Sequence, residues 1–133
     1  MPTKRNYPEH AAQSALFTWA GYAKGRYPDL ALMFAVPNAA RRTKGQRGWL
    51  LDEGLKAGVP DICLPAPRYD DNGRVMYHGM FIEMKAGKGR SSAAQSAWLD
   101  SLEKKGYYTI IANGFEEAKE AIEWYLTRNN KAA

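Results

Sequence analysis

Three ionisable side chains stand where a strand is normally apolar, and their types and spacing suit metal-assisted chemistry. Asp61 directly follows Gly58-Val-Pro60, and Glu83 and Lys85 lie within the apolar segment Met80-Phe-Ile-Glu-Met-Lys85. Residues two apart in a strand point to the same face, so Glu83 and Lys85 should project together. Glu83 comes 22 positions after Asp61. That spacing allows a hairpin to bring the two carboxylates side by side on neighbouring strands.

Two adjacent carboxylates repel each other and are costly to bury unless a cation lies between them. Carboxylate oxygens suit Mg²⁺ or Mn²⁺, which can also share the phosphate oxygens of a substrate. A lysine beside such a metal can position or deprotonate an attacking water and neutralise charge in a phosphoryl transition state. For Glu-x-Lys alone, a strand facing solvent is the simpler interpretation. The preceding Val-Pro-Asp and the basic character of the chain favour a metal-dependent nuclease instead.

The net charge of +5 is concentrated in the first part of the chain. Residues 1–50 carry eight Lys/Arg and two Asp/Glu, whereas residues 51–133 carry eleven and twelve. Such an excess favours a polyanionic partner, nucleic acid first among them, although ordinary solubility charge explains it equally well. The candidates for binding a phosphodiester backbone are Asn38, Arg41, Arg42, Lys44 and Arg47 after an expected strand, and Lys88 and Arg90 after the strand that carries Lys85.

The rest of the chain supplies the elements that would position these residues. Its 133 residues suit one domain, 1–133, with no linker or internal repeat. Apolar periodicity and capping residues predict a mixed α/β domain with one central sheet. We expect helices near 6–25, 49–56, 92–105 and 115–126, a buried strand at 30–36, a hairpin tip at 71–73, and further strands at 61–64, 75–77, 80–85 and 107–112. Trp19, Trp49, Trp98 and Trp124 are expected mainly in the core.

Several protein classes are disfavoured by the same sequence. No apolar run approaches the roughly 20 residues that span a bilayer, and the first ten residues lack the apolar segment of a secretory signal. The single cysteine, Cys63, excludes an internal disulfide and lies in an apolar stretch typical of a core position. A cytoplasmic protein, or one in the host cytoplasm if a phage encodes it, is the simplest interpretation.

Pro60-Asp61 followed by Glu83-Met84-Lys85 resembles the motif of the PD-(D/E)XK nuclease superfamily. The match extends further, through 53–58, 79–85, Gln95-x-x-Trp98 and Gly106-Tyr107. In this order the segments resemble the VRR-NUC family, including its small stand-alone phage-type members. The resemblance implies a restriction-endonuclease-like mixed sheet flanked by helices, with an αβββαβ core.

The resemblance also implies roles for individual residues. Asp61 and Glu83 resemble carboxylate ligands of Mg²⁺ or Mn²⁺, with the backbone carbonyl of Met84 completing the protein's share, and Lys85 resembles the catalytic lysine. Glu9 resembles a glutamate that reaches the metal directly or through water, and Gln95 resembles a glutamine that supports the lysine and the attacking water. Glu9 and Gln95 also fall at the last position of a capping box, so helix capping is an alternative for both.

The function implied is a DNA endonuclease that uses in-line attack by water, departure of the 3′ oxygen and formation of 5′-phosphate products. A domain of this size has little room for a sequence-reading module, so selectivity for branched DNA such as a Holliday junction is expected. Small stand-alone family members imply a homodimer with two active sites, with no small-molecule cofactor and no membrane partner. The alternatives are a nicking or flap nuclease, a non-catalytic nucleic-acid-binding module, and a small metal-binding protein without a polyanionic partner.

Overall fold

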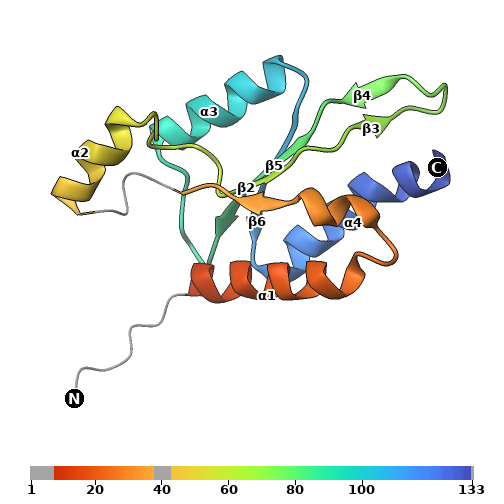
Figure 1. Cartoon of the computed structure of the whole chain (residues 1–133), viewed down its shortest axis with the longest axis horizontal. Helices are drawn as coiled ribbons and strands as arrows, with labels where there is room; N and C mark the ends of the chain where they lie inside the picture. The colour runs from red at the N-terminus through yellow and green to blue at the C-terminus, as the bar shows by residue number, and fades with distance from the viewer. Residues whose placement is uncertain (1–7, 38–42, 133) are drawn as a thin grey trace.

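A four-stranded mixed sheet lies at the centre of the computed structural model, which describes residues 8–37 and 43–132 (Figure 1). Its strands run in the order β1 (Phe34–Ala35), β2 (Ile62–Leu64), β5 (Met80–Lys85) and β6 (Tyr108–Asn113). β2 is antiparallel to β1 and to β5, whereas β5 and β6 are parallel. The parallel pair is joined by a helical crossover, as parallel strands require.

Helices cover both faces of this sheet (Figure 1). α1 (Pro8–Ala23) and α4 (Phe115–Ala132) contact each other, and they pack against β5 and β6 respectively. The crossover helix α3 (Ala93–Lys104) packs on β6 from the other face (Figure 1). The predicted α/β class, with a mixed central sheet flanked by helices, is confirmed.

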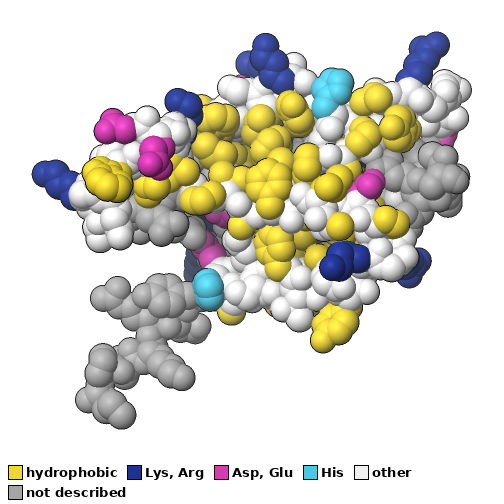
Figure 2. Space-filling view, in the orientation of Figure 1, with side chains coloured by type: hydrophobic (Ala, Val, Ile, Leu, Met, Phe, Trp, Pro, Cys, Tyr) yellow, Lys and Arg dark blue, Asp and Glu magenta, His cyan; other side chains and the backbone are white. Residues whose placement is uncertain are grey.

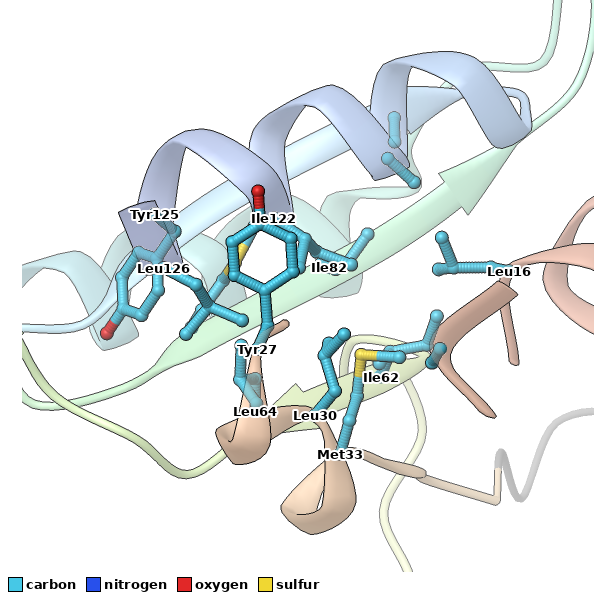
Figure 3. Close-up of a cluster of buried hydrophobic side chains, with 14 of the residues drawn as sticks. Leu16, Tyr27, Leu30, Met33, Ile62, Leu64, Ile82, Ile122, Tyr125 and Leu126 are labelled. Atoms are coloured by element: carbon cyan, nitrogen blue, oxygen red, sulfur yellow. The ribbon is translucent and has the colours of Figure 1, made fainter. Parts of the chain in front are cut away.

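The apolar core lies between the sheet and the α1–α4 layer, and it fixes the direction in which the polar strand residues point. Alternate strand positions Ile62, Leu64 and Ile82 are fully buried against Leu16 of α1 and Ile122 of α4 (Figure 3). The intervening positions 61, 63, 83 and 85 therefore point to the opposite face, the one covered by α3. The amino-acid alternation in two short strands thus places the chemically reactive side chains together, away from the core.

The buried strand expected at 30–36 is wrong for most of its length. Pro28 begins a 3₁₀ helix, η1 (Pro28–Leu32), and Leu30 is buried from that helix. Only Phe34 and Ala35 form a strand, and both are exposed because β1 is an edge strand with β2 as its partner. Proline at the start of a turn fixes a helical φ, so the backbone forms a 3₁₀ helix where the apolar run predicted a strand.

The short helix expected at 49–56 lies earlier in the chain than predicted. α2 (Lys44–Asp52) begins at a capping box in which Thr43 Oγ1 accepts from Gln46 N and Gln46 Oε1 accepts from Thr43 N. This capping pair lies within the basic segment that follows the expected first strand. Two of the expected core tryptophans are also exposed, Trp49 at 78% and Trp124 at 46%.

A hairpin of β3 (Arg68–Tyr69) and β4 (Val75–Tyr77) projects from the sheet, with its tip at the predicted 71–73. Asp70 Oδ1 accepts from the backbone N–H groups of Asn72 and Arg74, both at 2.9 Å. Gly73 has φ of +76°, which an L side chain adopts at a cost. The hairpin is anchored by Arg68, whose Nη1 donates to the carbonyls of Trp124 and of Tyr125 (2.8 Å) in α4.

Arg68→Met should lower the free energy of unfolding by about 3 kcal/mol, because it removes charge-assisted hydrogen bonds to two carbonyls. Arg68 is 5% exposed and its guanidinium lies 3.8 Å from the centre of the Trp124 ring, so stacking is lost as well. Urea denaturation measures the change. Arg74→Met is the matched control, since Arg74 is exposed at the hairpin tip and should change stability by less than about 0.5 kcal/mol. Equal stabilities for the two variants would contradict the anchoring role.

Two further expectations concern the single cysteine and membrane-spanning segments. Burial raises the pKa of the Cys63 thiol, so the thiol stays protonated, which agrees with a packing role for this half-buried residue. Among the helices of residues 8–37 and 43–132, none has the length and apolar character of a membrane-spanning segment.

Candidate active site

Asp61 and Glu83 face each other across neighbouring strands. Ile62 pairs with Ile82 in antiparallel register, which places Asp61, one residue before β2, opposite Glu83. Both carboxylates are buried, at 4% and 1% exposure. The predicted juxtaposition of the two acids is confirmed, although their role in binding a metal stays a prediction.

The backbone of Met84 completes this arrangement. Its N–H donates to Asp61 Oδ2 at 2.8 Å, which fixes the orientation of that carboxylate. The N–H and C=O of one strand residue leave the strand on the same side. The Met84 carbonyl therefore points toward β2, to the side on which Asp61 lies. The side chain of Met84, in contrast, is buried in the core at 1% exposure.

Lys85 projects from the same face as Glu83, as the spacing predicted. Its Nζ lies 3.6 Å from Glu83 Oε1, and its side chain is only 11% exposed. The main chain at this point is held by β6, since Gly114 N donates to Lys85 O at 3.1 Å. An ammonium group is thus held beside a buried carboxylate at the end of β5, where the sheet meets the loop to α3.

Gln95 joins these two side chains from the opposite layer. Its Oε1 accepts from Lys85 Nζ at 3.0 Å, and its Nε2 donates to Glu83 Oε1 at 3.0 Å. Oε1 also accepts from Ser92 N at 2.9 Å, while Gln95 N donates to Ser92 Oγ at 3.1 Å, which is a complete capping box. The capping interpretation of Gln95 is therefore confirmed, and the same amide contacts Lys85 and Glu83, whereas its support of an attacking water stays a prediction.

Glu9 approaches the same site from the first turn of α1. A Cβ placed on Gly89 would lie 3.8 Å from Glu9 Oε1 and 3.8 Å from Lys85 Cδ, so the carboxylate and the lysine border the same small space. The expected capping partner of Glu9, Asn6, falls outside the described residues. Because Glu9 is only half-buried, a contact with the proposed metal through water suits it better than burial of its carboxylate beside Glu83.

The donor set fits a hard divalent cation of the Mg²⁺ type. Asp61 and Glu83 offer carboxylate oxygens and Met84 a carbonyl, and Mg²⁺ characteristically takes one or two carboxylates and keeps waters or substrate oxygens. The set contains only oxygen donors, without the thiolate or imidazole ligands that are typical of zinc sites. Within residues 8–37 and 43–132, no group of three or more His, Cys, Asp or Glu side chains is assembled for a metal.

One positioning residue was missed by the sequence analysis. Asn113, at the end of β6, pairs with Lys85 in the parallel register, and its Nδ2 donates to Gly87 O at 3.0 Å. Asn113 N in turn donates to Glu117 Oε2 at 2.9 Å. This residue ties the loop after Lys85 to the start of α4. The available signal was a polar residue that ends an apolar strand directly before Gly114.

The approach to Asp61 is packed tightly against the start of α3. Gly58 has φ of +87°, and a Cβ there would lie 2.9 Å from both the carbonyl carbon and the Cβ of Ala94. Ala94 precedes Gln95. The turn that delivers Asp61 and the helix that delivers Gln95 are thus in direct contact through a glycine.

Gly58→Ala should therefore disturb the site as well as the fold. Strain at positive φ costs about 1–2 kcal/mol, and the contact with Ala94 must also push the first turn of α3 away. Gly54→Ala is a matched control, because Gly54 has φ of +100° with nothing within 4 Å of the added Cβ. We expect both variants to melt at a lower temperature because of the strain, with the larger loss for Gly58→Ala because of the contact with Ala94. The nuclease activity expected from the sequence should be lost only in Gly58→Ala, and equal activity of the two variants would contradict this coupling.

The basic candidates are only partly described. Lys88 and Arg90 are exposed in the loop between β5 and α3, and Lys44 is exposed at the start of α2. Arg47 lies on α2, but its side chain is outside the described part of the chain, as are Asn38, Arg41 and Arg42 altogether. Figure 2 shows acidic and basic side chains at the back of a hollow between α2 and the N-terminal end of α1. Their contact with nucleic acid stays a prediction.

Comparison with known proteins gives one family and one fold. The sequence profile of the VRR-NUC domain matches residues 35–116. A solved structure described as a VRR_NUC domain protein superimposes with a TM-score of 0.75 over 93% of this chain and 92% of that chain, at 24% identity. That identity supports the shared fold alone, which is the restriction-endonuclease-like fold expected from the sequence.

A short segment is also similar to a much longer bacterial protein. Over 53 residues the chain is 42% identical to the protein translocase subunit SecA of Wolbachia pipientis wMel and of Wolbachia sp. subsp. Brugia malayi (strain TRS). The segment makes up 39% of this chain and 6% of each translocase subunit. The similarity thus covers a small part of these curated relatives.

Proposed function

The chain belongs to the VRR-NUC domain family, and from this we propose that it is a metal-dependent endonuclease that hydrolyses phosphodiester bonds in DNA. The observation that carries the proposal is the hydrogen-bonded set in which Gln95 joins Glu83 and Lys85, with Asp61 facing Glu83. A binding module has no use for a lysine and two acids buried together at this cost. The family has a nuclease fold, and these side chains supply the chemistry.

Asp61, Glu83 and the Met84 carbonyl would hold Mg²⁺ or Mn²⁺. When bound, such an ion lowers the pKa of water and polarises the scissile phosphate. The hydrogen bond from the Met84 N–H fixes the orientation of the Asp61 carboxylate, so this group needs no reorganisation when the metal ion binds. Glu9, which borders the same small space as Lys85, would orient a water.

Lys85 is the residue proposed to act on the attacking water and on the developing phosphoryl charge. Its Nζ is fixed by Gln95 Oε1 at 3.0 Å and by Glu83 at 3.6 Å. A lysine held in this way enters the transition state without losing further side-chain freedom. Water then attacks the phosphorus in line, and the 3′ oxygen leaves, which gives 5′-phosphate ends.

DNA would enter across the exposed loop between β5 and α3. Lys88 and Arg90 lie in that loop, three and five residues after Lys85, and both are exposed. Lys44 on α2 is exposed as well, and Asn38, Arg41, Arg42 and Arg47 remain candidates from the sequence alone. These residues contact phosphates and therefore position DNA without reading its sequence.

Selectivity for branched DNA and action as a homodimer belong to the same proposal. A domain of this size gives one active site, and resolution of a Holliday junction requires two cuts. A dimer would place two such sites on one junction. Size-exclusion chromatography with light scattering tests this: a mass of one chain at micromolar concentration, with junction DNA absent or present, would contradict the dimer.

The decisive experiment for the proposed activity is a panel of labelled DNAs in Mg²⁺ or Mn²⁺. Single-stranded, duplex, flap and four-way-junction substrates should be incubated with wild type and with Asp61→Ala. We expect cleavage of branched substrates by wild type alone, abolished by EDTA. Faster cutting of a flap than of a junction would favour the nicking or flap alternative. Binding without cleavage in any metal would favour a non-catalytic module.

A further inference from the structure

α2 is a nine-residue helix that exposes an aromatic side chain. Trp49 is 78% exposed and Leu51 48% exposed, while Leu50 is half-buried. Figure 1 shows α2 standing apart from the two helical layers, near the first turn of α3. So short a helix is marginal alone in water, and a solvent-facing tryptophan on it adds nothing to the folding of the domain.

Both ends of the segment that carries α2 are attached at the site. On its entry side, Val36 N donates to Asp61 O at 2.7 Å. On its exit side, Gly58 touches Ala94, the residue before Gln95. Counting α2 at 1.5 Å per residue and the chain after it at its extended length, Trp49 lies at most about 35 Å from Asp61. That is close to the ~34 Å of one turn of B-DNA.

The surroundings of Trp49 fit a nucleobase. Trp49, Leu50, Gln46 and Glu53 border a shallow groove of about 280 Å³. α2 and its C-cap carry two cationic residues, Lys44 and Arg47, toward the N-terminal end and two acids, Asp52 and Glu53, at the C-terminal end, so phosphates would meet the N-terminal part of the helix. An aromatic platform next to cations is the usual way in which proteins hold unpaired bases without reading them, and Gln46 and Glu53 can hydrogen-bond to a base edge.

We propose that Trp49 is a specificity-determining residue, on which an unpaired base of the substrate stacks within about one turn of the phosphate that is cut. The inference rests on the proposed nuclease function and deepens it. Fully paired DNA keeps its bases stacked internally, so it gains nothing from Trp49. DNA with unpaired bases at a branch gains one stacking contact, and this difference supplies a physical basis for selecting branched substrates.

The experiment compares Trp49→Ala, Trp49→Phe and the control Tyr22→Ala on two DNAs, a perfect duplex and the same duplex carrying a flap with 2-aminopurine at the unpaired position. Tyr22 is matched because it is 86% exposed, but it lies near the C-terminal end of α1, thirteen residues beyond Glu9. Binding is measured by anisotropy with Ca²⁺, stacking by quenching of 2-aminopurine, cleavage with Mg²⁺, and mass by light scattering.

We expect Trp49→Ala to weaken flap binding about tenfold and to abolish quenching, with duplex binding within about twofold of wild type. Trp49→Phe should restore most of the affinity, and Tyr22→Ala should match wild type. Equal effects on both DNAs, or none on either, would overturn the proposal, as would loss of binding that accompanies dissociation of a dimer. If wild type cuts neither DNA, the nuclease function fails; if it cuts both and Trp49→Ala cuts the flap as fast, only the role of Trp49 fails.

Discussion

Lys85→Met is expected to slow DNA cleavage by about 10³-fold while leaving affinity for uncut DNA within about threefold of wild type. Methionine keeps the length and apolar stem of a lysine that is only 11% exposed, so the fold should tolerate it. What it removes is the ammonium group that Gln95 Oε1 and Glu83 hold at the end of β5. Single-turnover cleavage of a labelled flap in Mg²⁺ measures the rate, and anisotropy with Ca²⁺ measures the affinity.

The matched control is Lys104→Met, which changes the net charge by the same amount. Lys104 lies in the last turn of α3, is 75% exposed and pairs with Asp100 at 3.2 Å. Such exposed pairs contribute about 0–1 kcal/mol, so this variant should cut and bind like wild type. Cleavage by Lys85→Met at the wild-type rate would remove Lys85 from the mechanism. Parallel loss of rate and affinity would make it a phosphate contact instead.

The reactive centre was predictable because it depends on local rules. Strand alternation is enough to place Glu83 and Lys85 on one face, and a hairpin of the observed length is enough to bring Asp61 opposite Glu83. The spacing Ser92-x-x-Gln95 predicted a helix start, which the structure contains. What spacing alone left undecided was whether Gln95 caps or supports the site, since that depends on how α3 is placed against β5.

The regions that were not predicted depend on contacts between distant segments. Arg68 can be buried because α4 presents two backbone carbonyls to it, and no local sequence pattern around Arg68 predicts this contact with α4. Trp49 was placed in the core because large aromatics usually are buried. Its exposure follows from the position of α2, which is set by the capping pair Thr43–Gln46 and by the contact of Gly58 with Ala94. Asn113 was missed for the same reason, since Gly87 is 26 residues away.

Asp61→Asn should separate the catalytic role of Asp61 from its structural role. An asparagine keeps an oxygen that can accept from the Met84 N–H, and it removes one of two buried carboxylates that face each other. In EDTA, the variant should therefore melt at the wild-type temperature or a few degrees above it. Cleavage should fall by about 10³-fold, because the proposed metal loses a charged ligand. Differential scanning fluorimetry and the labelled flap substrate measure the two effects.

The response of stability to metal makes the prediction specific to Asp61. A ligand that binds only the folded state stabilises it by about 2.7 kcal/mol at 100 times its Kd, so Mn²⁺ should raise the melting temperature of wild type and leave Asp61→Asn unchanged. Asp100→Asn removes a surface carboxylate that is 65% exposed and should respond to Mn²⁺ as wild type does. If Asp61→Asn is strongly destabilised in EDTA, then its hydrogen bond to Met84 is chiefly structural. If its melting temperature rises with Mn²⁺ as much as that of wild type, Asp61 is not a ligand, and Glu83 with Glu9 becomes the pair to test.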